Sequence, residues 1–151
     1  MSQSLSNVVV HVVFSTKDRQ PLLEDKGIRE QMHLELGGTS NILNCPSIIV
    51  GGVADHVHIL ARQAKTITLS EWVKELKRVT SIWIKEKGPQ FDSFAWQSGY
   101  GAFSVSQSKL SNVIEYIQKQ EEHHEKSDFK TEFRKLLVRH EVEFDERYVW
   151  D

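Results

Sequence analysis

Cysteine is almost absent from this sequence of 151 residues, and its scarcity excludes a disulfide-stabilised scaffold. The single Cys45 has no partner for an internal disulfide, which fits a reducing cytoplasm, where a lone cysteine is usually a small packing residue. The sequence also lacks a Cys-x-x-Cys pair, a glycine-rich phosphate loop with its lysine, and a G-x-S-x-G elbow. Most familiar enzyme classes are therefore excluded.

Long apolar runs and an excess of basic charge are lacking as well. The first apolar segment has only the length of a strand and follows a polar start, so we expect no signal peptide, no membrane span and a cytoplasmic protein. The formal net charge of -2 provides no overall attraction for nucleic acid. With 39% hydrophobic residues and only 3 prolines, the chain is predicted to form one compact domain over residues 1–151.

Residue patterns predict strands and helices in a definite order. Strands are expected at 8–14, 47–53, 56–62, 94–96 and 102–105, and helices at 26–36, 68–87, 108–126 and 131–140. Around Gly99 and Gly101, between the last two strands, a bulge or a loop that substrate approaches is an equal alternative. The first helix is expected to stop at Gly37-Gly38. The segments 47–53 and 56–62 are short enough, and close enough, to form a hairpin. This order predicts a ferredoxin-like α+β fold, in which helices cover one face of an antiparallel sheet.

Two histidines on the second strand of this hairpin are candidate metal ligands. His56 and His58 flank Val57, and because side chains alternate along a strand, both imidazoles must leave the same face. Two neighbouring neutral imidazoles provide half of a metal site. An isolated pair of this kind is more often simply hydrogen-bonded in or near the core, so the pair alone does not identify the chemistry.

Tyr116 and Gln120 stand four residues apart on the helix predicted at 108–126, so they share one face, one turn apart. Both fall on the same flank of the apolar stripe that includes Val113 and Ile117. Taken without the histidines, Tyr116 would be an ordinary boundary residue and Gln120 a solvated polar group.

Other polar residues have simpler explanations. His123 and His124 lie on an acidic helix end, where solvated or helix-terminal groups are common, so we expect at most a supporting role for them. Basic residues of the helix at 68–87 line one of its faces, which is usual for a solvated helix surface. The tryptophans Trp72, Trp83 and Trp96 are expected in the core rather than as platforms for bases.

Taken together, these segments resemble the small single-tyrosine HUH transposases of the insertion-sequence-200/605 type and their REP-associated relatives. The resemblance spans nearly the whole chain. It is carried by the segments HVVFSTK at 11–17, VADHVHIL at 53–60, FAWQSGYGAFSVS at 94–106 and YIQKQ at 116–120. The family's histidine–hydrophobic–histidine triplet falls on His56, Val57 and His58, and its helical tyrosine and glutamine fall on Tyr116 and Gln120.

The resemblance implies that Tyr116 attacks single-stranded DNA to give a 5′-phosphotyrosine, after recognition of subterminal DNA hairpins. A divalent metal, Mg²⁺ or Mn²⁺, held by His56, His58 and Gln120 would neutralise and orient the scissile phosphate. The family also implies a homodimer formed by joining sheets, with active sites completed in trans. The identity of a general base is left open by the sequence.

The acidity of the chain implies local rather than global attraction for DNA. The expected DNA contacts are a small set of basic side chains: Lys17, Arg19, Lys74, Lys77 and Arg78. Two other interpretations remain open. One is a non-catalytic or domesticated single-stranded nucleic-acid-binding protein on the same fold. The other is a zinc metallohydrolase, which would need a third strong ligand and a carboxylate base that the sequence does not indicate.

Overall fold

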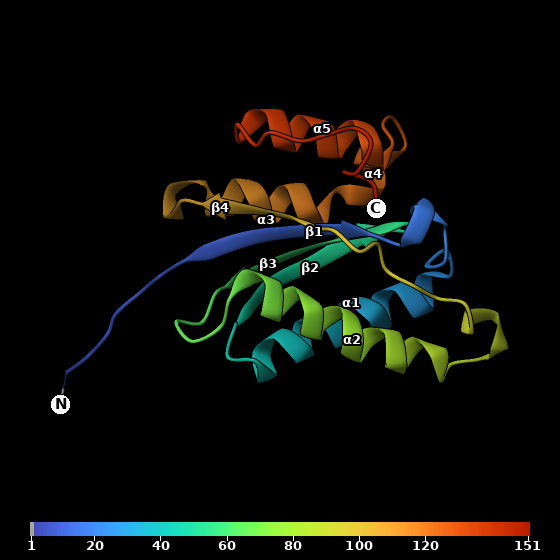
Figure 1. Ribbon diagram of the computed structural model, residues 1–151, viewed down its shortest axis with the longest axis horizontal. Coiled ribbons are helices and arrows are strands. Elements are labelled where there is room, and N and C mark those ends of the chain that lie inside the picture. The colour runs from blue at the N-terminus through green and yellow to red at the C-terminus, as the bar shows by residue number, and fades with distance from the viewer. Residues whose placement is uncertain (1) are drawn as a thin grey trace.

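The computed structural model describes residues 2–151. Its centre is a four-stranded antiparallel sheet in the order β2-β3-β1-β4 (Figure 1). The strands are β1 (Val9–Ser15), β2 (Ser47–Val53), β3 (His56–Arg62) and β4 (Gly101–Val105). The helices are α1 (Lys26–Ile42), α2 (Leu69–Lys85), α3 (Leu110–Gln118), α4 (Gln120–His124) and α5 (Phe129–Arg139), with short 3₁₀ turns η1 (Lys17–Arg19), η2 (Pro89–Phe91) and η3 (Gln107–Lys109). This is the predicted ferredoxin-like α+β arrangement.

The first strand is central and buried on both of its faces. β1 pairs with β3 on one side and with β4 on the other, so its backbone polar groups are used in two ladders. All seven of its residues are buried. Its side chains alternate, so Val10 and Val12 enter one apolar cluster while Val9 and Val13 enter clusters on the opposite face.

One face of the sheet, here called the helix-pair face, is covered by α1 and α2 (Figure 1). The side chain of Asp25 caps α1 by accepting from the backbone N–H of Ile28, and Thr68 caps α2 in the same way through Glu71. Both helices press apolar stripes onto the sheet. The largest fully buried side chains of this core include Trp72, Phe14, Phe94, Met32, Leu36 and Ile84.

The opposite face, here called the site face, is covered by α3, α4 and α5 (Figure 1). The prediction that helices cover only one face is therefore wrong in this detail. The nearly continuous apolar run of β1 is typical of a strand buried on both faces, so it indicated a second covering layer that the predicted fold did not include. The core of this layer includes Phe103, Phe129 and Phe133.

Several predicted boundaries also differ from the structure. α1 does not stop at Gly37 but runs on to Ile42. A side chain at Gly37 would meet the Ser47 hydroxyl at 3.2 Å, so this glycine permits close helix–strand packing instead of ending the helix. The helix predicted at 108–126 is broken at Lys119, whose backbone leaves the helical region. Residues 94–96 form no strand and contribute only a single bridge between Thr16 and Trp96.

Among residues 2–151, no helix combines the length and the apolar character that a bilayer crossing requires.

Candidate active site

The histidine pair of β3 lies fully buried beneath the helices of the site face. Val57 points into the core of the helix-pair face, whereas His56 and His58 leave the opposite face, as strand alternation requires. Both imidazoles have no exposed surface. Their ring centroids are 5.2 Å apart, so the pair forms one polar centre.

Each ring of the pair is held in place by a hydrogen bond at Nδ1. His56 Nδ1 lies 2.7 Å from the Asp55 carboxylate, and His58 Nδ1 lies 2.8 Å from His11 Nε2 on the neighbouring strand β1. Partners of this kind fix the orientation of an imidazole and leave Nε2 for another contact. Asp55 is thus an orienting residue for His56.

The structure brings Tyr116 and Gln120 to the same centre. Gln120 is buried, and its carboxamide oxygen lies 3.2 Å from His56 Nε2. The Tyr116 ring packs edge-on against His58, with 5.7 Å between their centroids. The two residues do not share one continuous helix, because the break at Lys119 places Tyr116 on α3 and Gln120 at the start of α4. All four residues expected at the site are therefore neighbours within one chain.

A residue that sequence reasoning missed, Glu132 of α5, stands at the middle of this group. Its side chain is 1% exposed. One carboxylate oxygen, Oε1, lies 3.2 Å from His56 Nε2 and 3.1 Å from His58 Nε2. The other, Oε2, accepts hydrogen bonds from the Tyr116 hydroxyl and from the Gln120 amide. The only sequence signal was a carboxylate bordering the apolar stripe of the predicted helix at 131–140.

His124 was expected to be a solvated or helix-terminal group, and it does end α4, but it is not solvated. Its side chain is 9% exposed, its Nδ1 bonds the Ser127 carbonyl at 2.6 Å, and its Nε2 lies 3.1 Å from Glu132 Oε1. That Nε2 is buried and has no well-directed hydrogen bond within the described residues 2–151. His123 is the more exposed of the two, at 38%, and its Nε2 lies 3.6 Å from Glu132 Oε2.

Burial and close charges shift the protonation of this centre. Burial alone would lower the pKa of His56, but hydrogen bonds with Asp55 and Glu132 raise it to about 9. Burial alone would raise the pKa of Glu132, but the surrounding histidines hold it well below its usual range. Burial, together with the Glu132 charge, raises the pKa of Tyr116 far above its ordinary value. At neutral pH the centre holds a carboxylate and a protonated phenol.

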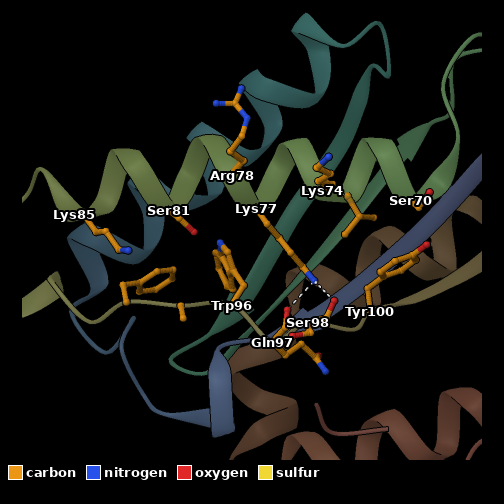
Figure 2. A pocket seen from close by; sticks show the side chains of 13 residues that line it. Ser70, Lys74, Lys77, Arg78, Ser81, Lys85, Trp96, Gln97, Ser98 and Tyr100 are labelled. Carbon is orange, nitrogen blue, oxygen red and sulfur yellow. Dashed lines mark hydrogen bonds between the residues drawn. The ribbon is translucent and has the colours of Figure 1, made fainter. Parts of the chain in front are cut away.

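The other candidate residues gather at a groove outside the helix-pair face, between α2 and the segment 94–100 (Figure 2). The groove is called the basic groove below. Its polar lining from α2 consists of Ser70, Lys74, Lys77, Arg78, Ser81 and Lys85. Lys77 differs from the rest, because its ammonium group donates to the carbonyls of Gln97, Ser98 and Gly99 at 2.8 to 3.2 Å. Lys77 therefore holds this loop in place.

The remaining basic candidates lie on η1. Arg19 donates to the Trp150 carbonyl at 2.6 Å, so its guanidinium is committed to the C-terminal segment. Lys17 is exposed, and its backbone N–H bonds the carbonyl of Ala95, which lines the basic groove. Trp72 and Trp96 are buried, as predicted for core residues.

A ferredoxin-like sheet that presents a histidine–hydrophobic–histidine strand to a helical tyrosine is the arrangement that the resemblance to single-tyrosine transposases implies. Residues 4–120 match the family model described as "Transposase IS200 like". This match covers more than half of the chain, and the chain belongs to that family.

Two solved structures support the same fold. A Deinococcus radiodurans R1 protein described as a candidate transposase has 20% identity and a TM-score of 0.61, with 80% of this chain and 98% of that chain covered. A REP-associated tyrosine transposase bound to a REP hairpin has 11% identity and a TM-score of 0.59, with 82% and 74% covered. No curated protein sequence matches the chain.

Proposed function

We propose that this protein cuts and rejoins single-stranded DNA at the ends of an insertion element, with Tyr116 as the nucleophile. The observation that carries the proposal is the position of the Tyr116 hydroxyl. It donates to the same carboxylate that His56 and His58 face. A phenolic nucleophile beside a pair of metal-type ligands suits covalent catalysis on a phosphodiester.

A divalent metal ion, Mg²⁺ or Mn²⁺, fits the donor set of this centre. His56, His58 and Gln120 would hold it, since their nitrogen and oxygen atoms converge at the site face. The buried His124 Nε2, which lacks a well-directed partner among residues 2–151, is a further donor of the kind that a metal satisfies. When bound, such an ion would neutralise the charge of the scissile phosphate and orient it.

In the proposed reaction, the Tyr116 oxygen forms a bond to phosphorus while the bond from phosphorus to the 3′ oxygen breaks. The product is a 5′-phosphotyrosine and a free 3′-hydroxyl, and the proton lost by the phenol is balanced by the one that the departing oxygen takes up. A second 3′-hydroxyl can reverse the step and release Tyr116, so joining needs no nucleotide cofactor. Glu132 fixes the direction of the attacking hydroxyl by accepting its hydrogen bond, and the Gln120 amide donates to Glu132 and to the backbone carbonyl of Tyr116.

The DNA ligand that we propose is a single strand with subterminal hairpins. Support comes from the basic groove, where Lys74 and Arg78 are exposed on α2 and Lys17 lies nearby. Cations spaced along one helix suit contacts with successive phosphates. Lys77 contributes charge and loop order, whereas Arg19 is the weakest of the proposed contacts because it is bonded to Trp150.

The assembly that we propose is a homodimer formed by joining sheets, with each active site completed in trans. β2 and β4 are the sheet edges available for joining, because each pairs with only one strand among residues 2–151. A single chain already brings Tyr116 to its own His58, so completion in trans requires α3 to be exchanged between subunits. Exchange of an identical element between protomers is a known route to dimers.

The chemistry is tested by incubating the protein with hairpin-containing single-stranded DNA and Mg²⁺ or Mn²⁺. We expect a covalent protein–DNA band whose DNA-linked peptide contains Tyr116. Attachment at Tyr100 or Tyr148 would contradict the choice of nucleophile. Binding of DNA without any adduct would instead favour the non-catalytic interpretation.

The trans arrangement is tested with mixed dimers. A Tyr116→Phe protomer and a His56→Ala/His58→Ala protomer are each inactive as homodimers. Their heterodimer has one intact composite site if completion is in trans and none if it is in cis. Verified heterodimers that bind hairpins but do not cleave would reject the trans arrangement and leave the four residues of the site in place.

A second candidate function, zinc-dependent hydrolysis, gains support from one observation. His124 is the third ligand and Glu132 the carboxylate that this alternative requires. Zinc retained through purification at one ion per chain, together with hydrolysis that survives Tyr116→Phe, would favour it.

A further inference from the structure

Four side chains from three different elements converge on the site face. They are His56 and His58 of β3, His124 of α4 and Glu132 of α5, and one donor atom from each lies within 4.8 Å of the others. The three imidazole Nε2 atoms surround a single point, since each lies 3.1 or 3.2 Å from Glu132 Oε1. Buried polar nitrogens need partners to be stable. Here the partner is a carboxylate, and a bound cation can be a further one.

All three rings are also oriented in the same way. The Nδ1 atoms of His56, His58 and His124 are held by Asp55, by His11 and by the Ser127 carbonyl, respectively. Every Nε2 is left facing the common point. Hydrogen bonding of the outer nitrogen is the usual arrangement for an imidazole that binds metal through the inner one.

His124 gives the most direct support for a metal ion at the point where the three Nε2 atoms converge. Its Nε2 is buried without a well-directed hydrogen bond in the described part of the chain. A buried polar atom of this kind calls for a partner, and a bound cation is one that an unprotonated imidazole satisfies. A purely structural ion pair with Glu132 would instead be expected to make a directed bond.

A surface hollow lies next to the same centre. It is lined by His124, Phe129 and Ala54 and by several carboxylates: Glu24, Asp55, Glu121, Glu125 and Asp128. One cation, Arg29, lines it as well and pairs with Glu121 at 2.9 Å, so the remaining carboxylates leave the hollow acidic. Carboxylates around an opening raise the local concentration of cations. Its lining includes His124, which is a member of the cluster, and Asp55, which bonds the cluster member His56.

We propose that His124 and Glu132 complete, with His56 and His58, a metal site of three imidazoles and one carboxylate. The inference rests on the proposed function and extends its ligand set of His56, His58 and Gln120. Residues 124 and 132 lie beyond the segment that matches the family model, which ends at 120. The site is thus assembled by α4 and α5 as well as by the strand and helix of the matched region.

The ligand types of the site determine which metal ion it prefers. Three imidazoles suit a transition-metal ion such as Mn²⁺ or Zn²⁺ better than Mg²⁺, which prefers oxygen ligands and keeps much of its water. Four protein ligands should also hold the ion when no DNA is present. The carboxamide oxygen of Gln120, 3.2 Å from His56 Nε2, stays the oxygen donor named in the proposed function, and its amide nitrogen donates to Glu132.

The test is metal binding by the full chain without DNA. Mn²⁺ is titrated by calorimetry into the wild type, Glu132→Gln and His124→Ala, and Co²⁺ is added to each protein to record its visible spectrum. We expect one Mn²⁺ per wild-type chain, with affinity falling on the order of tenfold or more in either variant. The Co²⁺ spectrum should change in both, because a ligand is lost from the coordination shell.

The matched control is Glu122→Gln, which removes an exposed carboxylate of α4. It should bind Mn²⁺ as the wild type does. Circular dichroism and thermal unfolding without metal verify that each variant is folded. If Glu132→Gln does not fold, His124→Ala decides the matter alone, because its ring lies at the edge of the cluster.

The outcome can be separated from that of the proposed function. Unchanged Mn²⁺ affinity and an unchanged Co²⁺ spectrum in folded Glu132→Gln and His124→Ala would overturn this proposal, even if Tyr116 still forms its DNA adduct. Conversely, loss of metal in these variants alongside a wild type that forms no adduct would leave the site standing and reject the transposition chemistry.

Discussion

The two faces of the sheet bury side chains of different kinds although they share the same strands. Beneath α1 and α2, β1 contributes Val10, Val12 and Phe14 to an apolar core. Beneath α3, α4 and α5, the same strand contributes His11 between Val9 and Val13, and this histidine bonds His58. One face therefore buries an apolar core, whereas the other surrounds a polar centre with apolar clusters of its own and holds the polar groups in fixed directions.

The comparison is tested most strongly by Tyr116→Phe. We expect DNA-adduct formation to fall by at least about 10³-fold, because the substitution removes only the nucleophilic oxygen. Hairpin binding should stay close to the wild-type value, since the ring still packs against His58, whereas the free energy of unfolding should fall by about 1 to 3 kcal/mol, because the buried Glu132 carboxylate loses a hydrogen-bond donor. Gel analysis of adducts, mobility-shift titration and urea unfolding measure the three quantities. Normal adduct yield from Tyr116→Phe would assign the chemistry to another residue.

Trp72→Ala tests the helix-pair face. Trp72 is fully buried, and its indole N–H donates to the Ser40 hydroxyl at 3.1 Å. Removing the ring should lower the free energy of unfolding by about 3 to 5 kcal/mol, because a large cavity is left in the core. Trp72→Phe, as the control, should cost less. A loss below about 1 kcal/mol for Trp72→Ala, measured by urea unfolding, would contradict the assigned role of this face.

A matched pair of lysines on α2 separates structure from DNA binding. Lys77→Met should lower the free energy of unfolding by about 1 to 3 kcal/mol, because the carbonyls of Gln97 and Gly99 lose a charged donor. Lys74→Met removes an exposed charge, so it should change stability by less than about 0.5 kcal/mol.

DNA binding, in contrast to stability, is tested by Lys74→Met. Lys74→Met should weaken hairpin affinity and reduce the slope of log affinity against log salt concentration by about one. Equal salt slopes for wild type and Lys74→Met would remove the basic groove from the proposed interface.

The smallest expected effect concerns pH. Burial, followed by the nearby Arg29, lowers the pKa of His33 on α1 to about 4. The unfolded chain takes up a proton at this residue near pH 6.5 while the folded chain does not, so stability should fall as the pH drops from 6.5 toward 4. His33→Gln should reduce the loss between pH 7 and pH 5 by about 1 to 2 kcal/mol. Parallel urea unfolding of both proteins at the two pH values measures the difference, and identical losses would refute it.

Much of the helix-pair face could be predicted from the sequence. The hairpin bounds were correct because β2 and β3 are short apolar runs separated by a turn, and α2 was marked by its cap and its amphipathic stripe. The predicted helix end at Gly37 was wrong, because a glycine that allows close packing cannot be distinguished by the sequence pattern from one that ends a helix.

The site face was harder to predict, because its key contacts join distant parts of the chain. The four family residues could be placed on elements, but no local pattern connects Glu132 with His56, which lies 76 positions earlier. Similarly, His124 has the sequence context of a solvated helix end, and only the packing of α4 and α5 buries it. The break at Lys119 is a backbone adjustment that residue periodicity does not record.

The central place of β1 has a consequence for the order of assembly during synthesis. This strand emerges first, yet its ladder partners are residues 56–62 and then 101–105. Both edges of β1 therefore stay unpaired until these partners have been synthesised. Strand pairing over such sequence separations is slow, because a long loop must be closed before the contacts form. Glu132 emerges later still, so a nascent chain carries the histidine pair for some time before the carboxylate that the folded protein places against it. The polar centre is thus among the last parts of the molecule to be completed.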